Sequence, residues 1–199
     1  SKIGIVSFAA GANTNQELCD VSVYASTLKS AINGLSANGG TRPDLGLAQA
    51  YNQLKGPLSV NNNKYVVLFT DGKPEASGIT EADLRANAEA QAELLEGIGV
   101  TVYSVFLGTD TSNRDWLANS IATSTAHAFS ASNAGGLDAI FDQISQEISD
   151  YKNATITDYI DSRFALVKGD NTTPYTDEEL TGGITLSDGG VLKVDDNGQ

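Results

Sequence analysis

The sequence is poor in the residues on which many active sites and metal sites depend. Its 199 residues include one cysteine, one histidine and no methionine. The single cysteine, Cys19, excludes an internal disulfide and a metal site built from several cysteines. It is either a small core residue or half of a disulfide to a segment outside this sequence. The sequence around the single histidine, His127, shows no Ser-His-Asp or Cys-His arrangement of a catalytic nucleophile and its base. We therefore expect a protein that is not an enzyme.

Basic residues are also scarce. Twelve Lys and Arg against 25 Asp and Glu give a formal charge of −13 and a pI near 4.2. Nucleic-acid binding needs clustered Lys and Arg, so this balance argues against nucleic acid and equally against an anionic membrane surface. No run of apolar residues is long enough to span a bilayer, so we expect no membrane insertion in this segment. An acidic surface suits cations and basic partners, although solubility alone also explains it.

The most informative segment is Lys64–Ser77, KYVVLFTDGKPEAS. Its apolar run, Tyr65–Phe69, stops at Thr70-Asp71-Gly72, which predicts a strand buried on both faces. Asp71 then lies at the carboxyl end of that strand, the edge at which open α/β sheets bind ligands. A plainer interpretation is that Asp-Gly makes the turn or that Asp71 caps the next helix.

Strand and helix patterns alternate as far as residue 150, which predicts a Rossmann-like α/β fold. Its sheet is expected to be mostly parallel, with helices on both faces. The other expected strands are Ile3–Ala9, Val100–Leu107, Ala126–Ser130 and, at an edge, Leu18–Val23. The expected helices are Ser26–Leu35, Pro43–Leu54, a helix from Thr80 to Gly97, Trp116–Ile121 and Leu137–Ile148.

The pattern changes after residue 150. Ala154–Val167 alternates apolar and polar residues, and glycine pairs bracket short apolar segments further on. This is typical of antiparallel β-structure. We therefore expect two domains, residues 1–150 with the α/β fold and residues 151–199 as the start of a β-rich domain, a partial β-sandwich stalk.

A second motif is Asn38–Tyr51, NGGTRPDLGLAQAY. Two glycines allow a tight turn before Thr41, which on the plainer interpretation is the N-cap of the following helix. Gly-Gly-Thr opening a helix, followed by strand-Thr-Asp-Gly at residues 70–72, resembles the von Willebrand factor A family. The resemblance covers residues 1–150.

The resemblance implies a metal-ion-dependent adhesion site for Mg²⁺, or for Ca²⁺ or Mn²⁺. The family builds it from an Asp-x-Ser-x-Ser loop, a threonine and an aspartate, and Thr41 and Asp71 match the last two. Hydroxyl and carboxylate oxygens suit a hard ion such as Mg²⁺. An open position on the ion would then accept a carboxylate from a ligand protein.

The first loop of that site is missing from this sequence. Asp20-Val-Ser22 and Asp110-Thr-Ser112 each continue with the wrong fifth residue and occupy the wrong place. We therefore expect an incomplete site that binds Mg²⁺ weakly or not at all in this chain alone. The family's first strand lies between the strands that match Ile3–Ala9 and Tyr65–Phe69. Val6 and Val67 should thus not lie on directly paired strands, and a missing N-terminal segment of the same protein should supply the strand between them.

The tail after residue 150 is similar to surface and pilus-tip adhesins of Gram-positive bacteria. The resemblance implies an extracellular protein, anchored at the cell surface or cell wall, that binds a host or matrix protein. Lys152 is either a candidate for an isopeptide crosslink or a solvated surface residue. A scaffold module without metal-dependent binding is the alternative function, and an intracellular partner of a metal chelatase or ATPase shares the fold.

Overall fold

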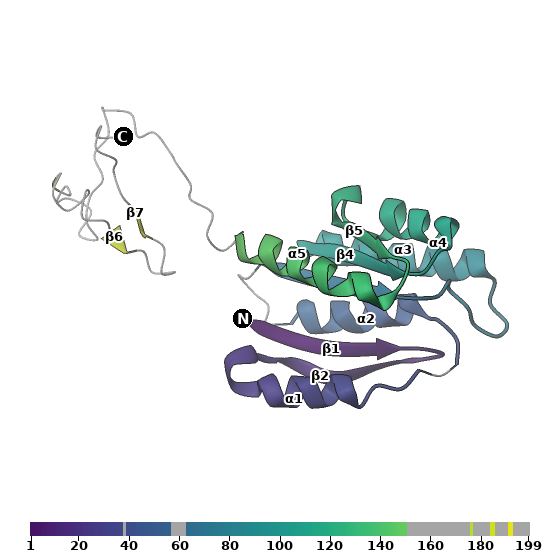
Figure 1. The fold of residues 1–199 in the computed structure, drawn as a ribbon, viewed down its shortest axis with the longest axis horizontal. Coiled ribbons are helices and arrows are strands. Elements are labelled where there is room, and N and C mark those ends of the chain that lie inside the picture. Colours follow the sequence, from purple (N-terminus) through teal and green to yellow (C-terminus); the bar gives the residue numbers. More distant parts are fainter. Residues whose placement is uncertain (38, 57–62, 151–175, 177–183, 186–190, 193–199) are drawn as a thin grey trace. The chain divides into compact units, whose positions relative to one another are not determined.

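The computed structural model describes residues 1–37, 39–56, 63–150, 176, 184–185 and 191–192 (Figure 1). The chain divides into two compact units, Ser1–Ser145 and Gln146–Gln199. In the second unit, β6 (Ile184–Thr185) and β7 (Val191–Leu192) form an antiparallel pair, each directly after a glycine pair. Lys152 and most of the predicted β-rich domain lie outside the described residues, so the β-sandwich stays a prediction.

The first unit contains a parallel sheet of three strands in the order β3-β4-β5 (Figure 1). β3 (Lys64–Thr70) pairs with β4 (Val100–Leu107) along its whole length, and β5 (Ala128–Ala131) pairs with the end of β4. The expected parallel sheet is therefore confirmed. Because the strands are parallel, their carboxyl ends, including Thr70, lie at one edge of the sheet.

An antiparallel hairpin of β1 (Lys2–Phe8) and β2 (Ala12–Asp20) forms a second sheet (Figure 1). The predicted edge strand over residues 18–23 coincides with β2 only at residues 18–20, and the predicted helix start at Ser26 was wrong. The chain leaves β2 at Asp20 and begins α1 (Val21–Asn33) at once, because the Asp20 carboxylate caps that helix. It accepts hydrogen bonds from the Ser22 N–H at 3.0 Å and the Ser22 hydroxyl at 2.8 Å. The hydrogen bond from the Ser22 hydroxyl is the main cause that lowers the pKa of Asp20.

Helices pack on both faces of the parallel sheet. The predicted bounds of α2 (Pro43–Leu54) are confirmed, and Thr80 caps α3 (Glu81–Gly97) as expected. Leu68 of β3 belongs to a core cluster with buried residues of α2 and α3, whereas its neighbour Phe69 points to the other face. There Phe69 contacts Phe141 of α5 (Leu137–Asp150), with ring centroids 6.4 Å apart.

The helix expected over Trp116–Ile121 begins earlier than the sequence pattern suggested. α4 (Thr111–Trp116) precedes a π-helical turn, Leu117–Ile121, and Asp110 caps α4 by accepting from the Ser112 and Asn113 N–H groups. Both Asp-x-Ser segments that imitate the family's first loop are thus helix N-caps, a pattern that the same residue types favour. Neither Asp20 nor Asp110 lies on the predicted metal-site loops.

Two strands are less buried than their apolar sequences predict. Most of β4 is buried, as expected for a central strand, but no residue of β1 is buried among the described residues. In β3, Val67 and Phe69 are 39% and 40% exposed. The prediction that these strands are buried on both faces was therefore wrong for the described structure. β1 and β3 lie in separate sheets, which confirms that Val6 and Val67 are not on directly paired strands. The strand expected between them stays a prediction.

Candidate metal centre

Asp71 lies where the sequence predicts, directly after β3 and exposed to solvent. A small local network shapes this turn. The buried Thr70 hydroxyl donates to the Gly72 carbonyl at 3.2 Å, and the Gly72 N–H lies 3.4 Å from the same hydroxyl oxygen. The turn is therefore fixed on both sides of Asp71, which is itself exposed.

Thr41 lies on the loop before α2, and its backbone is hydrogen-bonded to the loop that carries Asp71. The Thr41 N–H donates to the Glu75 carbonyl at 2.8 Å, and the Glu75 N–H donates to the Thr41 carbonyl at 2.9 Å. Thr41 is not the helix N-cap: Arg42 holds that position, without a side-chain capping bond. This leaves the Thr41 hydroxyl outside the helix cap.

Glycine makes this approach of the two loops possible. A Cβ atom on Gly40 would lie 2.3 Å from the Glu75 carbonyl oxygen, closer than any side chain allows. Gly39 has a φ of +78°, which L-residues with side chains rarely adopt. The Gly-Gly-Thr motif is thus explained by local geometry as well as by the family resemblance.

The Thr41 hydroxyl faces the residue that follows Asp71. Its Oγ1 lies 3.2 Å from the position that a Cβ atom on Gly72 would occupy. The structure therefore brings the two predicted loops together at the carboxyl edge of the sheet. That Thr41 and Asp71 hold one ion stays a prediction, although a hydroxyl and a carboxylate fit the oxygen ligands that Mg²⁺ prefers. Within the described residues, no three His, Cys, Asp or Glu side chains gather into an alternative metal site.

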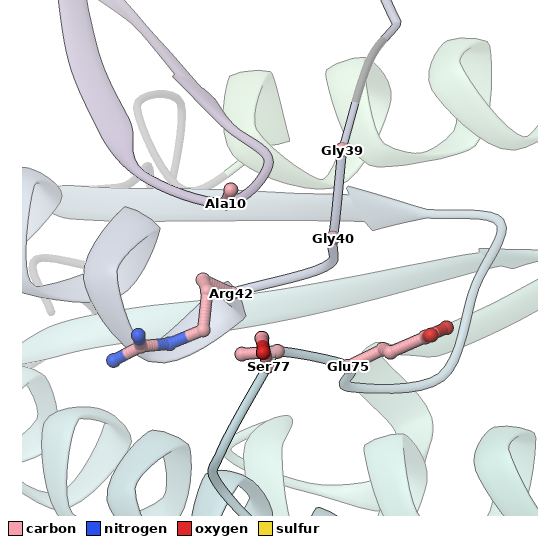
Figure 2. Close-up of a pocket in the computed structure, with 7 residues that line it drawn as sticks. Ala10, Gly39, Gly40, Arg42, Glu75 and Ser77 are labelled. Carbon is pink, nitrogen blue, oxygen red and sulfur yellow. The ribbon is translucent and has the colours of Figure 1, made fainter.

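A cavity of about 440 Å³ opens beside these loops (Figure 2). Its lining comes from the β1–β2 turn, the loop before α2 and the loop after β3: Ala10, Gly39, Gly40, Arg42, Glu75, Ala76 and Ser77. In Figure 2, the Arg42 and Glu75 side chains point in opposite directions, with Ser77 between them. The cavity is therefore polar at two separate points.

The positive charge on this wall is already neutralised. Arg42 donates to both carboxylate oxygens of Asp44, from Nε to Oδ1 at 2.9 Å and from Nη2 to Oδ2 at 2.6 Å. The side chains are 17% and 6% exposed. The hydrogen bond to Asp44 raises the pKa of Arg42, so the guanidinium stays charged and held. Glu75, by contrast, is exposed at the rim.

Two residues of this region were not found from the sequence. Glu75 contributes backbone bonds and a carboxylate, and Asn113 of α4 donates from Nδ2 to the Gly72 carbonyl at 3.0 Å. Asn113 is fully buried. The bond joins residues far apart in sequence, so no local pattern signals it.

Comparison with known proteins agrees with the described fold. A family profile for the von Willebrand factor type A domain matches residues 1–143. The von Willebrand factor domain of the type V pili tip protein Mfa5 from Porphyromonas gingivalis is similar in structure, with a TM-score of 0.63 and 17% identity. The match covers 79% of this chain and 83% of that one. At this identity the likeness concerns the fold alone.

A second similar structure is proximal thread matrix protein 1 from the mussel byssus. Its TM-score is 0.51 at 27% identity, over 75% of this chain and 33% of that one. A second crystal form of the same protein gives a TM-score of 0.50 at 25% identity. No curated protein sequence matches this chain significantly.

Proposed function

Because the chain belongs to the von Willebrand factor type A family, we propose that it is a cell-adhesion module that binds a protein through a divalent metal. Thr41 and Asp71 would be two of the metal-holding residues, and the ion would be Mg²⁺, Ca²⁺ or Mn²⁺. The observation that carries this proposal is the pair of backbone bonds between Thr41 and Glu75, which joins the two loops at the carboxyl edge of the sheet. The proposed activity is binding, not catalysis.

Two oxygen donors do not complete the coordination of such an ion, which takes six or more ligands. We propose that waters and a further loop of the same protein supply the others. Bound there, the ion would offer an open position to a ligand carboxylate. The chain's own contribution is to place the Thr41 hydroxyl and the Asp71 carboxylate on loops that the sheet and their mutual hydrogen bonds hold still.

The cavity beside the loops gives the ligand a second point of contact. A side chain next to the coordinating carboxylate would enter between Ala10 and Ser77. The positive charge of Arg42 is paired with Asp44, so the exposed Glu75 carboxylate would supply a negative charge at the rim of the cavity. This arrangement favours a ligand with a neutral or basic residue near its carboxylate.

The proposed setting is extracellular, on a cell surface, cell wall or pilus, with a host or matrix protein as the partner. The fold shared with a pili tip protein supports this setting. No helix in the described part of the chain is long and apolar enough to cross a membrane. A scaffold role without metal is the alternative, and the likeness to a thread matrix protein favours it.

Calorimetric titration with Mg²⁺ and Mn²⁺ tests the metal proposal. We expect weak or no binding to the 199-residue chain and measurable binding to the full-length protein. In that protein, Asp71→Ala should abolish binding and Thr41→Val should weaken it. Asp142→Asn removes an exposed carboxylate in the middle of α5 and should change nothing.

The same titration separates the alternatives. Tight binding to the 199-residue chain that Asp71→Ala abolishes would show that the chain carries a whole site. Absence of ion binding to the full-length protein would refute the metal-dependent proposal. Adhesion that persists in a chelator would then favour the scaffold role.

A further inference from the structure

A buried amide links α4 to the peptide that follows Asp71. Asn113 is 0% exposed, and its Nδ2 donates to the Gly72 carbonyl at 3.0 Å. Burying an amide without partners is costly, and a leucine of similar size would fill the same space without that cost. The hydrogen bond to Gly72 is therefore the feature of Asn113 that needs an explanation.

The Gly72 carbonyl accepts two side-chain hydrogen bonds. The Thr70 hydroxyl donates to it at 3.2 Å, in addition to the bond from Asn113. The Thr41 hydroxyl lies against the same residue. The orientation of the Gly72 peptide is thus set by a strand residue and a helix residue together, and Asp71 is the residue directly before it.

Asn113 is itself held in place by α3. Its Oδ1 accepts from Arg85 Nη2 at 3.5 Å, and Arg85 pairs with Glu81 at 2.9 Å. The Arg85 guanidinium also lies over the Trp116 ring, 4.6 Å from the centroid. The rotamer of Asn113 is therefore constrained from the side opposite Gly72.

We propose that Asn113 is a positioning residue that holds the Asp71–Gly72 turn in the geometry needed for metal binding. The inference rests on the proposed metal-dependent function. Asn113 does not contact the ion: it acts through the Gly72 peptide. Partners of this kind behind metal ligands typically change metal affinity about 10- to 100-fold when they are removed.

The variant Asn113→Asp separates positioning from electrostatics. An aspartate keeps the acceptor for Arg85 but places an oxygen against the Gly72 carbonyl, which removes the bond. Its added negative charge alone would raise cation affinity. A positioning role therefore predicts the opposite sign, an ion affinity about 10- to 100-fold lower in the full-length protein.

Ser112→Asp is the matched control. Ser112 is the neighbouring, exposed residue of α4, so this variant adds the same charge without touching Gly72. Its Mg²⁺ affinity should equal or slightly exceed that of the wild type. If Asn113→Asp binds Mg²⁺ as tightly as Ser112→Asp does, the positioning role is refuted.

Amide hydrogen exchange in the metal-free protein gives a second readout that needs no ion. Asn113→Asp should raise exchange at Gly72 and Lys73 while the α3 amides stay protected. Unchanged exchange at Gly72 would overturn the inference. If the wild type binds no ion, the proposed function fails, and the exchange data still decide whether Asn113 orders the turn.

Thr70→Val provides a test if Asn113→Asp does not fold. This variant keeps the shape of a buried side chain and removes the other bond to the Gly72 carbonyl. We expect faster exchange at Gly72 and weaker ion binding, in the same direction as for Asn113→Asp. Wild-type exchange and affinity in Thr70→Val would refute the claim that the Gly72 peptide controls the site.

Discussion

Replacing Gly40 with alanine is the sharpest test of how the two candidate metal-site loops meet. The added Cβ would lie 2.3 Å from the Glu75 carbonyl oxygen and 3.3 Å from the Glu75 carbonyl carbon. Both are backbone atoms, so no side chain can rotate away and the loops must separate. Separation strains or breaks the bonds of 2.8 Å and 2.9 Å between Thr41 and Glu75.

The size of the effect follows from those two bonds. A backbone hydrogen bond contributes about 0.5–1.5 kcal/mol net, so losing both lowers the free energy of unfolding by about 1–3 kcal/mol. Urea denaturation measures this change, and calorimetric titration of the full-length protein should show weaker ion binding, because Thr41 moves away from the Asp71 turn.

Gly11→Ala is the matched control for this substitution. Gly11 lies in the β1–β2 turn, and a Cβ there meets nothing within 4 Å. Its effect on the free energy of unfolding should stay within about 0.5 kcal/mol. If Gly40→Ala is as stable as Gly11→Ala and binds Mg²⁺ like the wild type, the described contact between the loops is wrong.

Two further predictions concern charged pairs. Asp44→Ala leaves the Arg42 guanidinium without its partner in a largely buried place and should lower the free energy of unfolding by about 3–5 kcal/mol in urea, whereas the double variant Arg42→Met/Asp44→Leu should recover most of the loss. The hydrogen bond from Arg85 is the main cause that lowers the pKa of Glu81 from 4.5. This bond therefore stabilises the folded state above pH 4.5, and the stabilisation is lost as the pH falls through the folded-state pKa of Glu81. Thermal unfolding of Glu81→Gln should therefore depend less on pH below 4.5 than that of the wild type, and identical profiles would contradict this linkage.

The sequence located elements well where one strong signal dominated. Pro43 at the start of α2 and the mostly apolar segment of β4 gave bounds that the structure confirms. Most of β2 was not predicted because its sequence, ANTNQELCD, contains few apolar residues, although its burial alternates along much of the strand. Pairing with β1, a tertiary contact, makes this polar segment a strand. The helix start differs from the prediction because Asp20, which also matches the start of a metal-ligand motif, is the N-cap of α1.

In the candidate site, too, some residues could be predicted from sequence motifs and others could not. Thr41 and Asp71 could be proposed as metal ligands because a motif on each loop is continuous in sequence, and the structure brings those loops together. Asn113 and Glu75 support the two loops through contacts between segments that are distant in sequence. The residues around them therefore form no pattern that would predict these contacts. Supporting residues of this kind require coordinates, since a buried asparagine has no periodic or spacing signature.

β1 and β3 are more exposed to solvent than their apolar sequences predict. Each strand has the apolar sequence of a strand covered on both faces, yet Ile3 is 45% exposed and Val67 is 39% exposed. Each also has one edge on which no described strand pairs with it, since β1 pairs with β2 and β3 pairs with β4. Edge strands exposed to water usually carry polar or charged side chains. The apolar side chains of β1 and β3 are therefore unusual beside edges that no described strand covers. The mismatch occurs on the two strands that should flank a common neighbour and is absent from β4, which has partners on both edges. An intervening strand would cover these apolar residues and pair with both free edges, and that strand stays a prediction.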